Sequence, residues 1–132
     1  MTGGCGCGAV RFEITEPFLS ASYCHCTRCQ RRTGTAASAN ARLAPGSFRI
    51  TAGEDELRAW TPETGMEKVF CGLCGSALFS RPPGGEPMGV RLGAIDGDPG
   101  IRPQWHQYVA YAASWQPLPD DGLPRYPESR PS

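Results

Sequence analysis

The sequence predicts a small, mainly β protein that is held together by bound metal, and three observations carry that prediction. Short segments alternate apolar and polar residues, whereas helical periodicity is confined to one stretch. The 132 residues include 17 glycines and 13 prolines, a composition that favours many turns between short elements. Aliphatic residues are scarce, yet seven cysteines are present. A chain with so few core residues needs disulfides or bound metal to stabilise its fold. Its length is that of a single domain, residues 1–132.

Strands are expected wherever the alternation recurs between turn-forming residues. These segments are 10–14, 37–43, 48–50, 57–60, 66–70, 77–80, 88–94 and 107–113. The two segments that flank Cys71–Ser76 predict a hairpin with this stretch at its tip. One short helix is expected from Thr27 to Gly34, because glycine suits the end of a helix. The tail from Pro117 is rich in Pro, Asp and Gly and is expected to wrap over the surface or to fray.

The seven cysteines form three clusters, in which every cysteine lies within three residues of another. The clusters are Cys5-x-Cys7, Cys24-x-Cys26-x-x-Cys29 and Cys71-x-x-Cys74. Disulfide frameworks spread their cysteines along the chain, whereas metal sites cluster them so that neighbouring thiolates face one ion. Zinc is the leading metal for thiolate ligands, with an iron–sulfur cluster as the alternative. A redox pair at Cys71 and Cys74 is a further alternative, but that motif needs a following helix, and none is predicted there.

Seven ligands divide most simply into a group of four and a group of three. A structural zinc site takes four protein ligands, whereas a catalytic site takes three and keeps one position for water or substrate. Joining the two outer pairs would tie the N-terminus to the middle of the chain, as a structural site does. The central triplet lies within six residues, so its ligands would cover only one side of an ion. Alternatively, His25 or His106 completes the triplet and makes it purely structural.

Residues near the triplet are candidates for binding or catalysis. Arg28, Arg31 and Arg32 could offset the charge of the thiolates or bind carboxylates of a peptide-like substrate, or they could be solvated surface charges. His106 is a candidate acid or base, or alternatively a structural histidine. His25, between two ligands, is expected to hydrogen-bond around the metal site rather than to act as a base.

Other polar and aromatic residues are expected to be structural. Asp96 precedes a glycine and is expected to serve the turn there. Because the aliphatic core is thin, the large aromatic side chains are expected to fill it. They are Tyr23, Trp60, Trp105 and Trp115.

Five segments, taken together and in order, carry a family resemblance. They read CGCGAVRFE, YCHCTRCQRRTG, FRITAGEDELRAW, VFCGLCGSALF and RLGAIDGDPGIRPQWHQYVAYAASW. With these motifs the chain resembles the family of glutathione-dependent formaldehyde-activating enzymes, also called centromere protein V-like proteins, from Gly4 to about Tyr126. It departs from the common family pattern at Ala94 and Ile95, where Thr and Leu are usual.

The resemblance implies a fold of small coiled β-sheets held by zinc, shared with Rab-interacting exchange factors and methionine-R-sulfoxide reductases. It also implies two zinc ions per chain. The implied ligands are Cys5, Cys7, Cys71 and Cys74 for a structural zinc, and Cys24, Cys26 and Cys29 for a catalytic one.

The activity implied by the resemblance is that of a carbon–sulfur lyase, which reversibly combines glutathione and formaldehyde into S-hydroxymethylglutathione. Two other classes of function stay open. One is a non-catalytic zinc module that binds a protein partner. The other is a redox or sulfoxide-reducing enzyme, which would need a cysteine that does not bind metal.

Charge and hydropathy narrow the partners and the compartment. The formal net charge is zero, so nucleic acid is not expected as a partner. The apolar run Tyr108–Ala113 is too short to cross a membrane, and the first residues lack the pattern of a secretory signal. The cytoplasm is therefore the expected compartment, and thiols are normally reduced there.

Overall fold

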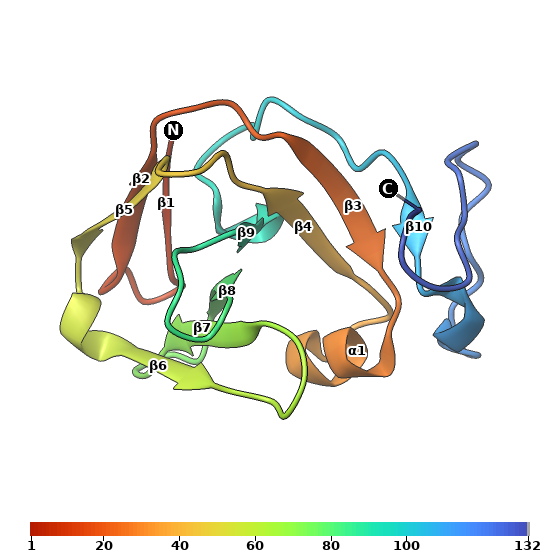
Figure 1. Ribbon diagram of the computed structural model, residues 1–132, viewed down its shortest axis with the longest axis horizontal. Coiled ribbons are helices and arrows are strands. Elements are labelled where there is room, and N and C mark those ends of the chain that lie inside the picture. The colour runs from red at the N-terminus through yellow and green to blue at the C-terminus, as the bar shows by residue number, and fades with distance from the viewer. Residues whose placement is uncertain (132) are drawn as a thin grey trace.

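Two β-sheets dominate the protein, and the computed structural model describes residues 1–131 (Figure 1). The first sheet has the order β1-β2-β5 and the second the order β10-β3-β4-β9-β8-β7-β6. The strands are β1 (Thr2–Gly4), β2 (Arg11–Ile14), β3 (Ser20–Cys24), β4 (Ser38–Arg42), β5 (Phe48–Ala52), β6 (Leu57–Trp60), β7 (Glu67–Cys71), β8 (Ala77–Arg81), β9 (Gly89–Arg91) and β10 (His106–Gln107). The prediction of a mainly β protein is confirmed.

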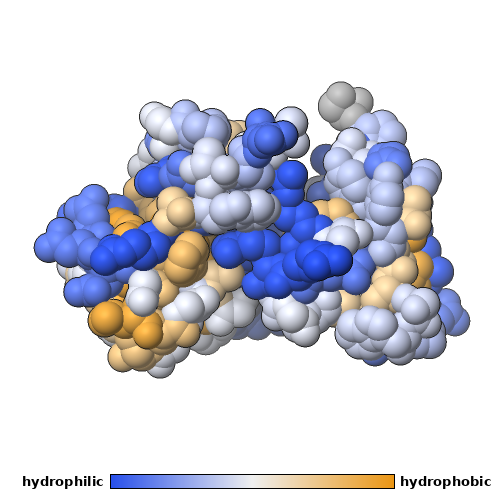
Figure 2. Space-filling view, turned by 90° about the horizontal axis from the view of Figure 1, so that it is seen from below, coloured by the Kyte–Doolittle hydropathy of each residue, from blue (hydrophilic) through white to orange (hydrophobic). Residues whose placement is uncertain are grey.

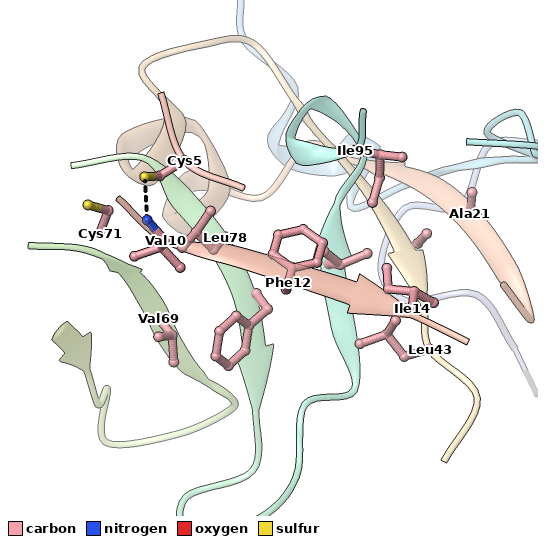
Figure 3. Packing of buried hydrophobic residues seen from close by; sticks show 13 residues of the cluster. Cys5, Val10, Phe12, Ile14, Ala21, Leu43, Val69, Cys71, Leu78 and Ile95 are labelled. Carbon is pink, nitrogen blue, oxygen red and sulfur yellow. Dashed lines mark hydrogen bonds between the residues drawn. The ribbon is translucent and has the colours of Figure 1, made fainter. Parts of the chain in front are cut away.

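The hydrophobic core lies between the two sheets. One row of paired residues crosses the large sheet and is buried along its whole length: Ala21, Ala41, Val90, Phe79 and Val69. Phe12 of β2 lies at the centre of the core (Figure 3), with its ring centroid 4.9 Å from that of Phe48. The Phe48 ring is in turn 4.8 Å from Phe79. Because side chains alternate along a strand, each strand needs few apolar residues to cover this face.

The opposite face of the large sheet is polar, for the same reason of alternation. Its paired residues form two rows, Ser20–Arg42–Gly89–Ser80–Lys68 and Ser22–Asn40–Arg91. Both rows begin on β3, whose last residue on this face is Cys24. The sheet therefore separates an apolar core from a polar, positively charged surface that adjoins one of the cysteine clusters.

The helix α1 (Thr27–Thr33) begins and ends as the sequence predicts. The Sγ atom of Cys26, the N-cap residue, accepts a hydrogen bond from the backbone N–H of Cys29 at 3.3 Å. Gly34 ends the helix with a φ of 67°, a left-handed conformation that favours glycine, and its N–H bonds to the carbonyl of Gln30. The N-terminal cap thus places Cys26 and Cys29 at the start of the helix, directly after β3.

Some strands differ from the prediction. The alternation pattern misses β1 and β3, because their glycine, serine and alanine residues form strands only through pairing with β2 and β4. The segment 88–94 is extended only to Arg91, where η2 (Leu92–Ala94) begins. The predicted strand 107–113 is wrong beyond Gln107, where β10 ends: Tyr108 has a left-handed φ of 58°, and η3 (Val109–Tyr111) follows. A third 3-10 turn, η1, spans Glu54–Glu56.

The segment after Pro117 wraps over the surface, one of the two outcomes expected for it. The backbone N–H of His106 donates to the carbonyl of Pro124, and that of Tyr126 donates to the carbonyl of His106, both at 2.9 Å. Residues 124–126 therefore lie along β10 on the side away from β3. Among the helices within residues 1–131, none combines the length and apolar character needed to cross a membrane.

The aromatic residues divide between core and surface. Trp105 is buried, with 8% of its surface exposed, as expected. The expectation is wrong for Trp60 and Trp115, which are 43% and 66% exposed, because β6 is the edge strand and Trp115 lies beyond the last helix turn. Asp96 does more than serve a turn: it pairs with Arg11 and accepts a hydrogen bond from the Thr2 hydroxyl.

Candidate metal centres and the adjacent cleft

The outer cysteines converge into a group of four thiols. Cys5 and Cys7 follow β1, and the hairpin of β7 and β8 supplies Cys71 and Cys74. The four Sγ atoms all lie within 4.8 Å of one another, with Cys5 to Cys7 at 3.5 Å and Cys7 to Cys71 at 3.9 Å. A tetrahedral ion with sulfur ligands at about 2.3 Å places its sulfurs about 3.8 Å apart. None of these four thiols forms a disulfide. Their spacing already suits one bound ion.

Hydrogen bonds around this group favour the thiolate form of two of its members, Cys5 and Cys74. The backbone N–H of Val10 donates to Cys5 Sγ at 3.2 Å, a contact drawn at the end of the core in Figure 3. The hydroxyl of Ser76 lies 3.2 Å from Cys74 Sγ and lowers the pKa of this thiol to about 5. Gly75, with a φ of 79°, turns the hairpin tightly enough for its N–H to reach the carbonyl of Cys71 at 2.8 Å.

The central cysteines converge into a group of three thiols. Cys24 ends β3, Cys26 caps α1 and Cys29 lies in the first turn of α1; their Sγ atoms also lie within 4.8 Å of one another. A hydrogen bond from Cys24 lowers the pKa of Cys29 to about 5 and outweighs its burial; the Arg91 charge acts in the same direction. Within residues 1–131, neither His25 nor His106 belongs to this group.

Behind the three-thiol group runs a chain of hydrogen-bonded side chains. His25 Nε2 lies 2.8 Å from His106 Nδ1, and His106 Nε2 lies 2.7 Å from Asp121 Oδ2. His106 is only 2% exposed and stacks on Tyr23. The hydrogen bond from His106 lowers the pKa of Asp121, so its carboxylate accepts the Nε2 proton. His25 and His106 thus face each other through ring nitrogens, one of which donates while the other accepts.

The three-thiol group opens onto a cleft of about 450 Å³. Cys24 and Cys29 line one part of it, and the polar face of the large sheet forms its floor. Four basic side chains and no acidic one line this cleft within residues 1–131: Arg42, Lys68, Arg91 and Arg130. Burial lowers the pKa of Lys68, while the nearby Cys29 acts in the opposite direction. This cleft therefore suits a negatively charged ligand that also carries a group able to bind beside Cys24 and Cys29.

The structure turns the three arginines of the triplet segment away from this cleft. Arg28 lies over the ring of Trp60 and donates to the carbonyl of Thr64. Arg32 lies over the Phe70 ring and lines a second cavity, on the side of the four-thiol group. Arg31 is exposed and lines none of the cavities described within residues 1–131.

Sequence reasoning missed the basic residues that do line the cleft. Lys68 lies next to buried Val69 on β7, and Arg91 lies next to buried Val90 on β9, so alternation alone places both on the polar face. The order of strands that brings these two side chains to one cleft cannot be found from alternation. No sequence pattern predicts that Arg130 lines the cleft, because its position depends on how the C-terminal segment packs along β10.

A family model described as glutathione-dependent formaldehyde-activating enzyme matches residues 1–111. The chain belongs to this family. Membership associates it with glutathione-dependent formaldehyde activation or related chemistry, and with enzymes. The protein is also similar to the crystal structure of a Rhodobacter sphaeroides protein, with a TM-score of 0.57 and 26% sequence identity. That similarity covers 96% of this chain and 99% of the other.

Both cysteine groups fit the metal that the family resemblance implies. Their donors are thiols alone, the ligands that zinc accepts in closed sites and in sites open to substrate. Backbone N–H groups donate to sulfur in each group, to Cys5 and to Cys26, as expected around bound thiolates. The two groups could therefore bind metal ions, and their chemistry is consistent with zinc.

Proposed function

We propose that this protein is a zinc-dependent carbon–sulfur lyase that acts on glutathione or a related carboxylate-bearing thiol. One observation carries the proposal: three converging thiols open onto a cleft that contains four basic side chains and no acidic one within residues 1–131. Membership in a family associated with glutathione-dependent formaldehyde activation supports the same chemistry. A cytoplasmic location and the absence of a nucleic-acid partner stay predictions.

The two thiol groups would each hold a zinc ion, but for different purposes. Cys5, Cys7, Cys71 and Cys74 would hold a structural zinc, because four protein ligands complete a tetrahedral site. Cys24, Cys26 and Cys29 would hold a catalytic zinc, which when bound stabilises a substrate thiolate or polarises a carbonyl oxygen.

The basic side chains of the cleft would bind and orient the substrate. Glutathione carries two carboxylates, each of which an ammonium or guanidinium group can bind by charge-assisted hydrogen bonds. Lys68 is partly buried at the floor, where an ion pair is less screened than at the surface. Arg91 donates to the side-chain oxygen of Asn40, which holds its guanidinium in place beside the three thiols. Binding the carboxylates would thus direct the sulfur toward the three-thiol group.

The proposed reaction changes no oxidation state. The sulfur of the thiol forms a bond to the carbonyl carbon of formaldehyde, and the carbon–oxygen double bond becomes a single bond. The proton lost by the thiol ends on that oxygen, giving the S-hydroxymethyl adduct, and the reverse reaction breaks the same bond. The chain's side chains contribute by holding the sulfur near the carbonyl and by stabilising negative charge on sulfur or oxygen.

His106 would act as a positioning residue rather than as the acid or base considered from the sequence. It is buried, is not part of the cleft lining and hydrogen-bonds to His25, which lies between Cys24 and Cys26 in the sequence. It would thereby fix the loop that carries Cys24 and Cys26.

The proposal is tested by measuring glutathione binding calorimetrically and formaldehyde–adduct exchange by NMR, on protein loaded with zinc. The wild-type protein is expected to bind glutathione and to accelerate exchange, whereas Lys68→Gln binds about 10-fold more weakly. Lys68→Arg is the matched control that keeps the positive charge. Absence of both binding and exchange would contradict the lyase and favour a non-catalytic zinc module.

A further inference from the structure

The C-terminal segment, which lies beyond the residues matched by the family model, forms one wall of the cleft. Ser129, Arg130 and Pro131 line it together with the floor of the sheet. Figure 2 shows the C-terminal part of the chain as a lobe at the right of the molecule, set off from the body by an indentation. The wall is therefore built by a segment that is remote in sequence from both thiol groups.

Backbone and side-chain contacts fix this segment in place. Besides its two bonds to His106, the segment accepts two more: the N–H of Tyr108 donates to the carbonyl of Glu128 at 2.9 Å, and that of Val109 to the carbonyl of Tyr126 at 3.0 Å. Asp121, at the start of the segment, accepts from His106. The segment is thus anchored to β10 and to the residues that follow it, directly before the residues that line the cleft.

Arg130 is held in a defined orientation at this wall. Its guanidinium carbon lies 3.9 Å from the centroid of the Trp105 ring, a cation–π contact. Gln107 supports the pair, because its Oε1 accepts from the Trp105 indole N–H at 3.2 Å and from the Arg130 backbone N–H at 3.5 Å. No carboxylate within residues 1–131 forms an ion pair with Arg130. Its charge therefore stays available to a ligand in the cleft.

The basic side chains consequently approach the cleft from two sides. Arg42, Lys68 and Arg91 come from the sheet, and Arg130 comes from the C-terminal wall. Consider a ligand whose sulfur lies near Cys24 and Cys29. With a single carboxylate, it could bind the basic side chains of only one side. A ligand with two separated carboxylates could contact both sides.

Resting on the proposed function, we infer that Arg130 is a specificity-determining residue that binds a carboxylate of the thiol substrate. The C-terminal segment thereby selects thiols that carry at least two carboxylates, such as glutathione, over small uncharged thiols. Rigid stacking on Trp105 lowers the conformational entropy that the long arginine side chain would lose on binding.

The experiment compares two thiols on zinc-loaded, full-length protein by titration calorimetry. Glutathione carries two carboxylates, and 2-mercaptoethanol carries none. Arg130→Gln is expected to weaken glutathione binding about 10-fold and to leave 2-mercaptoethanol binding within about 2-fold of wild type. Arg130→Lys is expected to restore part of the loss. Arg49→Gln, which removes an exposed charge outside the cleft, is expected to bind both thiols as wild type does.

The outcomes separate this inference from the proposed function. If wild type binds both thiols and Arg130→Gln binds glutathione equally well, the inference is overturned and the proposed function stands. An equal loss for both thiols also overturns it, because that result shows a general disturbance of the site. If wild-type protein binds neither thiol, the proposed function fails, and the inference fails with it.

Discussion

The two thiol groups use the same donor atoms but differ in how the chain assembles them. The four-thiol group joins residues that are distant in sequence, since Cys7 and Cys71 are 64 positions apart yet have their sulfurs within 3.9 Å. The three-thiol group is local, because a strand end and the first turn of α1 supply all its members. The first borders the hydrophobic core, whereas the second borders the basic cleft.

Ligand chemistry alone therefore does not decide the role of a cysteine cluster. A group that closes a long loop stabilises the folded chain, because it removes conformational freedom from the unfolded one. A group on one short loop closes almost no loop, so it contributes little to stability and is free to serve a ligand. Variants of each group test whether the two groups differ in this way.

The largest effect is expected from Cys71→Ser. This fully buried thiol belongs to the four-thiol group, and a structural zinc contributes about 10–16 kcal/mol in small zinc domains, as much as a whole domain's stability. We expect the variant to lose cooperative thermal unfolding, measured by circular dichroism. Cys26→Ser, which removes a thiol from the three-thiol group, is the control. A native-like melting curve for Cys71→Ser would show that this group is not structural.

Cys26→Ser should instead keep the fold and abolish function. Serine is a good helix N-cap, so its hydroxyl can replace Sγ as the acceptor for the N–H of Cys29. Loss of one of three ligands is expected to weaken glutathione binding by about 100-fold or more, while the melting temperature changes little. Calorimetry and circular dichroism on one preparation measure both, and unchanged binding would remove this group from the substrate site.

A smaller effect is expected where the tail supports the three-thiol loop. Asp121→Ala removes the acceptor for His106 Nε2 and should speed metal transfer from the three-thiol group to a chelator about 10-fold. Asp121→Asn keeps an oxygen acceptor and should behave nearly as wild type does. The rate of transfer to a chromogenic chelator measures this, and equal rates for the Ala and Asn variants would contradict a positioning role.

The smallest effect is expected from Arg31→Gln. This side chain is exposed and lies outside the cleft, although it follows Cys29 by only two positions. Glutathione binding should stay within about 2-fold of wild type. A loss of glutathione affinity as large as that expected for Lys68→Gln would show that the arginines near the triplet bind the substrate after all.

The sequence predicted what local chemistry determines. Cysteine spacing predicted which thiols group together, and Gly34 predicted where α1 ends, because both depend on a few neighbouring residues. Alternation found most strands but missed β3, whose small residues become a strand only beside β4. The cleft escaped prediction because Lys68 and Arg91 meet through strand order, and Arg130 arrives by a tail that returns to β10.

The charge-transfer absorption of cobalt-loaded protein during a glutathione titration tests most directly whether the three-thiol group receives the substrate sulfur. Seven cysteine thiolates bound to two ions would become eight sulfur ligands when glutathione binds, so the intensity should rise by about one seventh. The rise should saturate with the affinity found by calorimetry and vanish in Cys26→Ser. Calorimetric binding with no spectral change, or a rise that persists in Cys26→Ser, would contradict a three-thiol group that receives the substrate sulfur.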